Sequence, residues 1–206
     1  SIILLLNSDN GRLEGANPAA CNYYGWTHSE LCSKSIYDFS TIDKNETINW
    51  LQTVKAEFKN HLFSQHHLAN GETREVEIYS SPINIAKKTM IYSVIRDITE
   101  QRNAELQLRK LSKAVEQSPI GICITDPAGI IEYVNPKISK LTGFAQGELL
   151  NKDVMILGTG EKSNQLHQDL WQTISSGNVW SGEFHNKKKN GRLYWESDTI
   201  SPIFDA

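Results

Sequence analysis

The sequence has few cysteines, no strong excess of charge and no long hydrophobic run. Its three cysteines, Cys21, Cys32 and Cys123, form no Cys-x-x-Cys pair, so neither a disulfide framework nor a zinc site is indicated. The net charge of -3 at pH 7 excludes a strong basic field of the kind that holds nucleic acid or an anionic membrane surface. The apolar runs are shorter than the roughly 18 residues that span a bilayer. We therefore expect a reducing compartment, the cytoplasm, with no nucleic acid and no membrane contact by this segment.

The sequence repeats itself once. Five short elements recur 118 residues later, as Gly129 follows Gly11, and two further elements recur 120 residues later, as Asn190 follows Asn70. A period near 120 residues matches the usual size of a domain, whereas solenoid units are only about 20 to 50 residues long. Two domains are therefore expected. The elements are Gly11, Glu14, Asn17-Pro18, Gly25, Glu30-Leu31, Asn70-Gly71 and Ser81-Pro82-Ile83, matched by Gly129, Glu132, Asn135-Pro136, Gly143, Glu148-Leu149, Asn190-Gly191 and Ser201-Pro202-Ile203.

Each repeat predicts strands first, helices in the middle and strands last. Asn17 and Asn135 are expected to cap a helix that has proline at its first position, and Asn-Gly pairs predict tight hairpins between later strands. This order is typical of an α+β fold, a five-stranded antiparallel sheet with helices on one face. The predicted strands of repeat one are 2–6, 12–15, 61–68, 74–82 and 89–98, and those of repeat two are 121–125, 130–134, 180–186 and 193–203; the longer helices are 45–59 and 165–175.

Repeat two ends before a counterpart of strand 89–98, so we expect the second domain to be truncated before its last strand and the chain to be cut from a longer protein. Within repeat one, Val76 and Ile78, and likewise Tyr92 and Val94, alternate with polar neighbours. Such alternation is typical of half-buried strands.

The segment between the repeats, residues 100–118, predicts a helical linker. Ala104, Leu108, Leu111 and Val115 follow one another at spacings of four, three and four, and charged residues flank them. This seam (Ala104, Leu108, Leu111 and Val115) favours a short parallel coiled coil in a homodimer. The alternative is a lone amphipathic helix packed on its own domain. The domains are accordingly 1–99, the linker 100–118, and 119–206.

These motifs resemble the PAS sensor family over nearly the whole chain, and Asp97-Ile98-Thr99-Glu100 before the linker is the most specific of them. The resemblance implies two PAS domains that bind a small-molecule ligand or cofactor between sheet and helices. Asp97 and Thr99 would then pass a change in the sheet to the linker and its seam residues Leu108 and Leu111. A plain helix-capping role for Asp97 or Thr99 is the alternative, and both roles are compatible.

Repeat two is also similar to flavin-binding PAS domains of redox sensors, such as those of nitrogen-fixation regulators. The similarity lies in Leu170-Trp171, Gly177, Trp180-Ser181-Gly182-Glu183, Asn186 and Tyr194-Trp195-Glu196. It implies FAD in the second domain, with Trp180 beside the isoalloxazine, Asn186 at its polar edge, and Trp171 as a further contact. In the alternative, Trp171 and Trp180 fill the core and Asn186 ends a strand. No ligand is indicated for repeat one.

Other PAS chemistries are disfavoured. The Asn-Cys-Arg-Phe-Leu-Gln motif of light-oxygen-voltage domains is absent. His167 is expected at a helix surface, and His66 and His67 point to opposite faces of one strand, so they cannot chelate a metal together.

We therefore expect no catalytic residue and no metal site. The leading hypothesis is the sensory input region of a bacterial signalling protein whose output is a histidine kinase or an enzyme of cyclic-di-GMP turnover, a diguanylate cyclase or phosphodiesterase. The alternative is a ligand-free scaffold for dimerisation and domain spacing.

Overall fold

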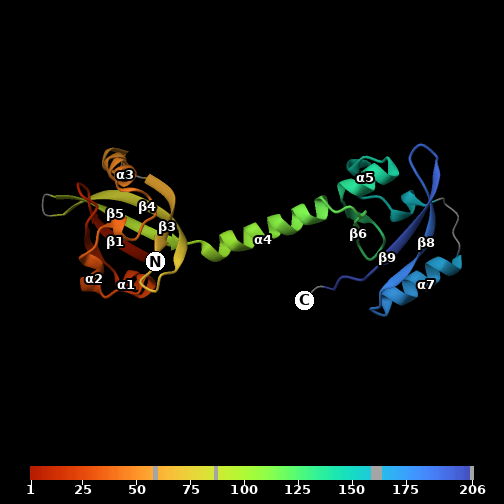
Figure 1. The fold of residues 1–206 in the computed structure, drawn as a ribbon, viewed down its shortest axis with the longest axis horizontal. Coiled ribbons are helices and arrows are strands. Elements are labelled where there is room, and N and C mark those ends of the chain that lie inside the picture. The colour runs from red at the N-terminus through yellow and green to blue at the C-terminus, as the bar shows by residue number, and fades with distance from the viewer. Residues whose placement is uncertain (58–59, 86–87, 159–163, 205–206) are drawn as a thin grey trace. The chain divides into compact units, whose positions relative to one another are not determined.

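The computed structural model describes residues 1–57, 60–85, 88–158 and 164–204, and it divides the chain into two compact units, residues 1–107 and 108–206 (Figure 1). Each unit is α+β. The helix α4, Thr99–Glu116, runs without a break from the end of the last strand of unit 1 into unit 2. The predicted linker is therefore helical.

Unit 1 contains one five-stranded antiparallel sheet. Its strands are β1 (Ile2–Asn7), β2 (Leu13–Ala16), β3 (Asn60–His67), β4 (Thr73–Ile85) and β5 (Lys88–Asp97). Their order across the sheet is β2-β1-β5-β4-β3, so the last strand lies in the centre and pairs with both β1 and β4. The hairpin between β3 and β4 turns at Asn70-Gly71 as predicted, and Gly71 has a φ of +86°.

The helices of unit 1 lie between β2 and β3 in the chain: α1 (Pro18–Tyr24), α2 (His28–Cys32), the short 3-10 helix η1 (Ile36–Asp38) and α3 (Lys44–Glu57). Asn17 accepts the N–H of Ala20 at 2.9 Å, which confirms it as the cap of a helix that begins with Pro18. The expected α3 extends to residue 59, but residues 58 and 59 lie outside the described residues.

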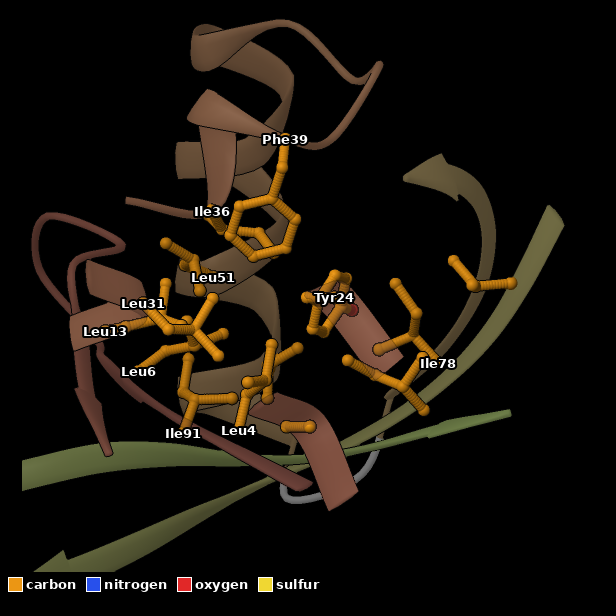
Figure 2. Close-up of a cluster of buried hydrophobic side chains, with 14 residues drawn as sticks. Leu4, Leu6, Leu13, Tyr24, Leu31, Ile36, Phe39, Leu51, Ile78 and Ile91 are labelled. Carbon is orange, nitrogen blue, oxygen red and sulfur yellow. The ribbon is translucent and has the colours of Figure 1, made fainter. Parts of the chain in front are cut away.

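The core of unit 1 lies between the helices and one face of the sheet (Figure 2). Tyr24, Leu31 and Leu51 from the helices and Leu4 and Leu6 from β1 are fully buried together. On β5 the buried residues are Ile91, Ser93 and Ile95, whereas Tyr92 is exposed and Val94 half-buried. Tyr92 and Val94 therefore lie on the outer face of the sheet, and Val76 and Ile78 lie on its inner face.

Unit 2 has the same order of elements. They are β6 (Cys123–Thr125), β7 (Ile131–Val134), α5 (Pro136–Thr142), α6 (Gln146–Leu149), the 3-10 helix η2 (Val154–Leu157), α7 (Asn164–Ser175), β8 (Trp180–Lys187) and β9 (Leu193–Ile200). The strands form two separate pairs, β6-β7 and β8-β9. Because β5 is the strand that joins the two hairpins of unit 1, the missing counterpart of β5 among the described residues accounts for this separation. Three predicted strands are shorter than expected: β6 begins at Cys123, β7 begins at Ile131 and β9 ends at Ile200.

Candidate functional site

A small hydrogen-bond network joins the end of β5 to helix α4. The Oδ1 atom of Asp97 accepts the backbone N–H of Thr99 at 2.8 Å and its hydroxyl at 2.6 Å. The hydroxyl oxygen of Thr99 in turn accepts the backbone N–H of Glu75 on β4 at 2.9 Å. Burial raises the pKa of Asp97, but the hydrogen bonds from Thr99, together with Tyr23 and the charge of Arg74, outweigh it, so the net pKa is lowered and the carboxylate stays ionised. The structure therefore brings the predicted residues Asp97 and Thr99 together, and adds Glu75 to them.

The other end of α4 is held by Asn135. This side chain is fully buried, and its Nδ2 donates to the carbonyl of Val115 at 3.1 Å and to that of Ile120 at 2.9 Å. Its Oδ1 accepts the N–H of Ile122 at 3.0 Å, besides capping α5. The sequence predicts Asn135 only as a helix cap; its contact with the last turn of α4 has no signal there.

The seam of α4 is open in the single chain. The side chains of Leu108 and Leu111 are 68% and 64% exposed, and none of the residues from Thr99 to Glu116 is buried. Only the start of the helix makes a ring contact with unit 1 in the described part of the chain, through the guanidinium of Arg102, which lies 5.3 Å from the centre of the Phe63 ring.

The hairpin β8-β9 presents two different faces. Alternation along the strands puts Trp180 and Asn186 on the inner face, where they are 4% and 8% exposed, together with Tyr194, Glu196 and Asp198. The indole N–H of Trp180 donates to Asp169 of α7 at 3.0 Å. The ring lies over Gly182, where a Cβ atom would clash with it.

Asn186 is held at the other end of the same strand. Its Nδ2 donates to Glu196 at 2.8 Å, and the Tyr194 hydroxyl donates to the same carboxylate oxygen at 3.0 Å. Asn186 lies six positions after Trp180 in the extended strand, which places their Cα atoms roughly 20 Å apart. The two residues thus share a face but would contact different parts of a ligand.

Trp171 lies elsewhere. Its side chain on α7 is 42% exposed, and its ring is next to Gly129 at the turn between β6 and β7. The structure therefore places two of the three predicted flavin residues on one face of the hairpin, at opposite ends of β8, and the third elsewhere. An aromatic ring suits the flat face of a heterocycle, and an amide with acidic acceptors suits a polar group.

Asp198 on this inner face and Cys123, whose thiol it influences, both have raised pKa values. Burial, and then the nearby Glu196 carboxylate, raise the pKa of Asp198 to about 6. Burial, and then Asp198, raise the pKa of the Cys123 thiol to about 11. Cys123 is therefore a thiol and not a reactive thiolate at neutral pH.

His66 and His67 point to opposite faces of β3, as their positions in a strand require. His66 is fully buried, whereas His67 is exposed and its ring is 2.9 Å from the hydroxyl of Thr73. His167 lies on α7, and its side chain is outside the described residues. Within the described ranges, no group of three or more His, Cys, Asp or Glu side chains could hold a metal ion. None of the helices in the described part of the chain combines the length and apolar character needed to cross a bilayer.

Two family models together account for nearly the whole chain. The one described as PAS domain matches residues 1–100, and the one described as PAS fold matches residues 109–206. The chain belongs to the PAS family. As PAS domains, the two units confirm the fold predicted from the repeated motifs.

Curated relatives of this PAS pair are signalling proteins. The chain is 31% identical to the nitrogen fixation regulatory protein of Klebsiella oxytoca over 91 residues, 44% of this chain and 18% of the relative. It is 31% identical to diguanylate cyclase DgcM of Escherichia coli K12 over 109 residues, 52% of this chain and 26% of that protein. It is 33% identical to hybrid signal transduction histidine kinase L of Dictyostelium discoideum over 97 residues, 47% of this chain and 6% of that protein. The chain thus spans about a quarter or less of these relatives.

Two solved structures are among the matches. A PAS domain from Colwellia psychrerythraea covers 48% of this chain and 84% of its own, at 21% identity and a TM-score of 0.46. An RNA-binding light-oxygen-voltage receptor covers 99% of this chain and 91% of its own, at 11% identity and a TM-score of 0.42.

Proposed function

We propose that this PAS pair is the sensory input region of a larger cytoplasmic signalling protein, in which helix α4 links the state of the two domains. The curated relatives named for nitrogen-fixation regulation, diguanylate cyclase and histidine kinase activity support this role. An enzymatic output, histidine kinase or cyclic-di-GMP turnover, would then belong to other parts of the protein.

The observation that carries the proposal is the hydrogen bonding of α4 at both ends. Thr99 ties its first residue to β4 through Glu75, and Asn135 ties Val115 in its last turn to unit 2. A signal requires a ligand whose affinity differs between two arrangements of the protein. Because hydrogen bonds hold each end of the helix to a domain, a change in the arrangement of that domain would also shift the helix.

For the second domain we propose FAD as the cofactor. The supporting residues are Trp180, whose ring is fixed by Asp169, and Asn186, which Glu196 orients; Trp171 is the weaker member because it lies apart from them. When bound, FAD would supply reversible oxidation and reduction. Trp180 and Asn186, which lie at opposite ends of β8, would contact separate parts of the cofactor.

The first experiment measures the visible absorbance of flavin in the purified chain. We expect Trp180→Ala and Asn186→Ala to lose flavin while both variants stay folded by circular dichroism. Trp195→Phe is the matched control, because Trp195 lies on the outer face of the same hairpin and is 69% exposed. Stoichiometric flavin in both alanine variants would remove the site, and a colourless wild-type protein without any co-purifying molecule would favour the scaffold instead.

The second experiment tests transmission. Amide hydrogen exchange is compared between oxidised and chemically reduced flavoprotein at Gln117, whose N–H donates to Lys113 at 2.9 Å at the end of α4. We expect a change there and none in α3 of unit 1. Identical exchange at Gln117 in both redox states would contradict transmission through α4.

A further inference from the structure

Tyr23 on helix α1 carries a buried hydroxyl that has no hydrogen-bond partner among the described residues. Buried polar groups in folded proteins are almost always paired, because an unpaired one loses its hydrogen bonds to water without replacement. Three other buried atoms without partners, on His66, Trp50 and Thr47, line a cavity of about 20 Å³ in unit 1. A space of this size holds about one or two ordered waters, which can pair them. Tyr23 does not line that cavity, so its hydroxyl needs a different explanation.

Helix α1 is attached to the sheet through the residue that follows Tyr23. The hydroxyl of Tyr24 lies 2.8 Å from Nδ1 of His66 on β3, and the carbonyl of Tyr24 accepts the N–H of Ala69, just beyond that strand, at 2.8 Å. The rings of Tyr23 and Tyr24 meet edge-on, with their centres 5.0 Å apart. A displacement of α1 relative to β3 therefore moves both tyrosines together.

The neighbouring part of the sheet carries Arg74 and Asp97. Arg74 on β4 is paired with His66, and Val76, two positions later in β4, is paired with Asp97 of β5. Side chains two positions apart lie on the same face of a strand, so Arg74 and Asp97 are diagonal neighbours. Nη1 of Arg74 lies 4.0 Å from Oδ2 of Asp97. Arg74 also donates to Glu72, so its charge is shared between two carboxylates.

The Tyr23 hydroxyl lies beside the Asp97 carboxylate without closing a hydrogen bond to it. Burial, and then the charge of Asp97, raise the pKa of Tyr23, and the Tyr23 hydroxyl follows Thr99 among the groups that lower the pKa of Asp97. The two groups are therefore close neighbours. Because the hydroxyl has no partner in hydrogen-bonding geometry, the contact between them is open in this arrangement.

We propose that Tyr23 is a positioning residue that couples helix α1 to the start of helix α4, with its hydroxyl donating to Oδ2 of Asp97 in a second arrangement of unit 1. Oδ1 already accepts two hydrogen bonds from Thr99, so Oδ2 is the acceptor that remains. Closing the bond would draw the end of β5 toward α1, and Thr99, the first residue of α4, would follow. The inference rests on the proposed sensory role of the chain and names a means of regulation within unit 1.

Unit 2 provides an internal comparison for this position. The offset of 118 residues places Leu141 of α5 where unit 1 has Tyr23, and Thr142 where it has Tyr24. A leucine has no hydroxyl, so the elements that both units share form without one at this position. The Tyr23 hydroxyl is therefore not a requirement of the fold, which favours a role at the junction with α4.

The first test measures the pKa of the Asp97 side chain in the whole chain by carbon-13 NMR of its carboxyl group. Tyr23→Phe removes the hydroxyl and keeps the ring, so we expect the pKa of Asp97 to rise by about one pH unit. The amide of Arg102, which donates to Ile98 at 2.9 Å in the first turn of α4, should exchange about fivefold faster. Tyr92→Phe, on the outer face of β5, is the matched control and should change neither value.

A double-mutant cycle separates coupling from a loss of stability. Tyr24→Phe removes the hydroxyl beside His66 and loosens α1 from β3, so it should change the exchange at Arg102. In the Tyr23→Phe protein the same substitution should have no further effect at Arg102, because the contact through which α1 acts is already absent. A purely structural role predicts additive effects of the two substitutions. Circular dichroism checks that each variant is folded.

Two results would overturn the proposal: an unchanged pKa of Asp97 in Tyr23→Phe, or additive effects of the two tyrosine substitutions at Arg102. If Tyr24→Phe does not fold, the first test still decides, because Tyr23 is only half-buried and its ring is retained. Neither result concerns the flavin absorbance or the redox dependence of exchange at Gln117. Failure here is therefore separate from failure of the proposed function.

Discussion

Asn135 donates a hydrogen bond from its side-chain amide to the backbone carbonyl of Val115, over 3.1 Å, and so holds the last turn of α4. Its counterpart in unit 1, Asn17, makes the equivalent bond to Ser1 at 2.9 Å. In both units, an asparagine at the same place in the fold therefore donates to the backbone that precedes the first strand. In unit 2 that backbone is the linker helix.

Asn135→Asp separates the two functions of this side chain. An aspartate can still accept from Ile122 and cap α5, but it cannot donate to the carbonyls of Val115 and Ile120. We expect unit 2 to lose about 1–3 kcal/mol of unfolding free energy and the amide of Gln117 to exchange faster. Asn17→Asp is the control, and it should leave Gln117 unchanged. Equal exchange at Gln117 in wild type and Asn135→Asp would show that the contact does not hold the helix.

Acid should destabilise unit 1 through His66. Its pKa is about 3 in the folded state, against 6.5 for an unperturbed histidine, so the unfolded chain binds more protons between these values. The contribution of neutral His66 to the unfolding free energy of unit 1 is therefore fully present above about pH 6.5. It falls as the pH is lowered, by up to about 1.4 kcal/mol per pH unit. Denaturant unfolding of unit 1 at a series of pH values measures this slope. We expect His66→Gln to flatten it and the exposed His67→Gln to keep it.

Asp198 should give unit 2 the opposite trend. Its folded pKa is raised to about 6 from 3.8, so the native state binds more protons in this window, and stability falls as the pH rises through it. Asp198→Asn should remove this part of the pH dependence and stabilise unit 2 by about 1–2 kcal/mol at neutral pH, allowing for partial exposure. Chemical denaturation at acidic and neutral pH checks both effects. Glu183→Gln, on the outer face of the hairpin, is the control and should retain the wild-type difference.

The seam of α4 should form a dimer. Leu108→Glu together with Leu111→Glu places charges on the two exposed leucines, and we expect sedimentation to report monomers. Arg109→Glu with Lys110→Glu alters charge next to the seam without replacing its apolar residues, and it should stay dimeric. A mass unchanged by the leucine substitutions would place any dimer contact elsewhere.

Much of the fold follows from local chemistry that the sequence displays. Asn17 and Asn135 precede proline, and both cap helices; Asn70-Gly71 and Asn190-Gly191 both turn hairpins. These signals depend on residues that are close together in the sequence, so packing elsewhere in the protein does not change them. The inward face of β5 is harder to predict, since a central strand contacts the core on one face and carries apolar residues such as Tyr92 on the other.

The candidate sites are less completely predictable. Trp180 and Asn186 lie six positions apart in one strand, so an even spacing places them on one face, whereas Trp171 depends on how α7 packs. Thr47 and Trp50 are three positions apart on α3, but no spacing in the sequence links them to His66 of β3. One signal is present: Leu62, Ser64, His66 and Leu68 alternate, and the leucines place the histidine on the inward face.

The central position of β5 has a consequence for biosynthesis. Strand β1 pairs with β2 at one edge, but its other edge pairs with β5, which the ribosome makes more than 80 residues later. Until β5 emerges, β1 and β4 each lack the neighbour that they have in the finished sheet, and open edges are the part of a sheet most prone to pair with another chain. Because Asp97 and Thr99 follow directly, the domain closes its sheet and begins its outgoing helix in a single late step of synthesis.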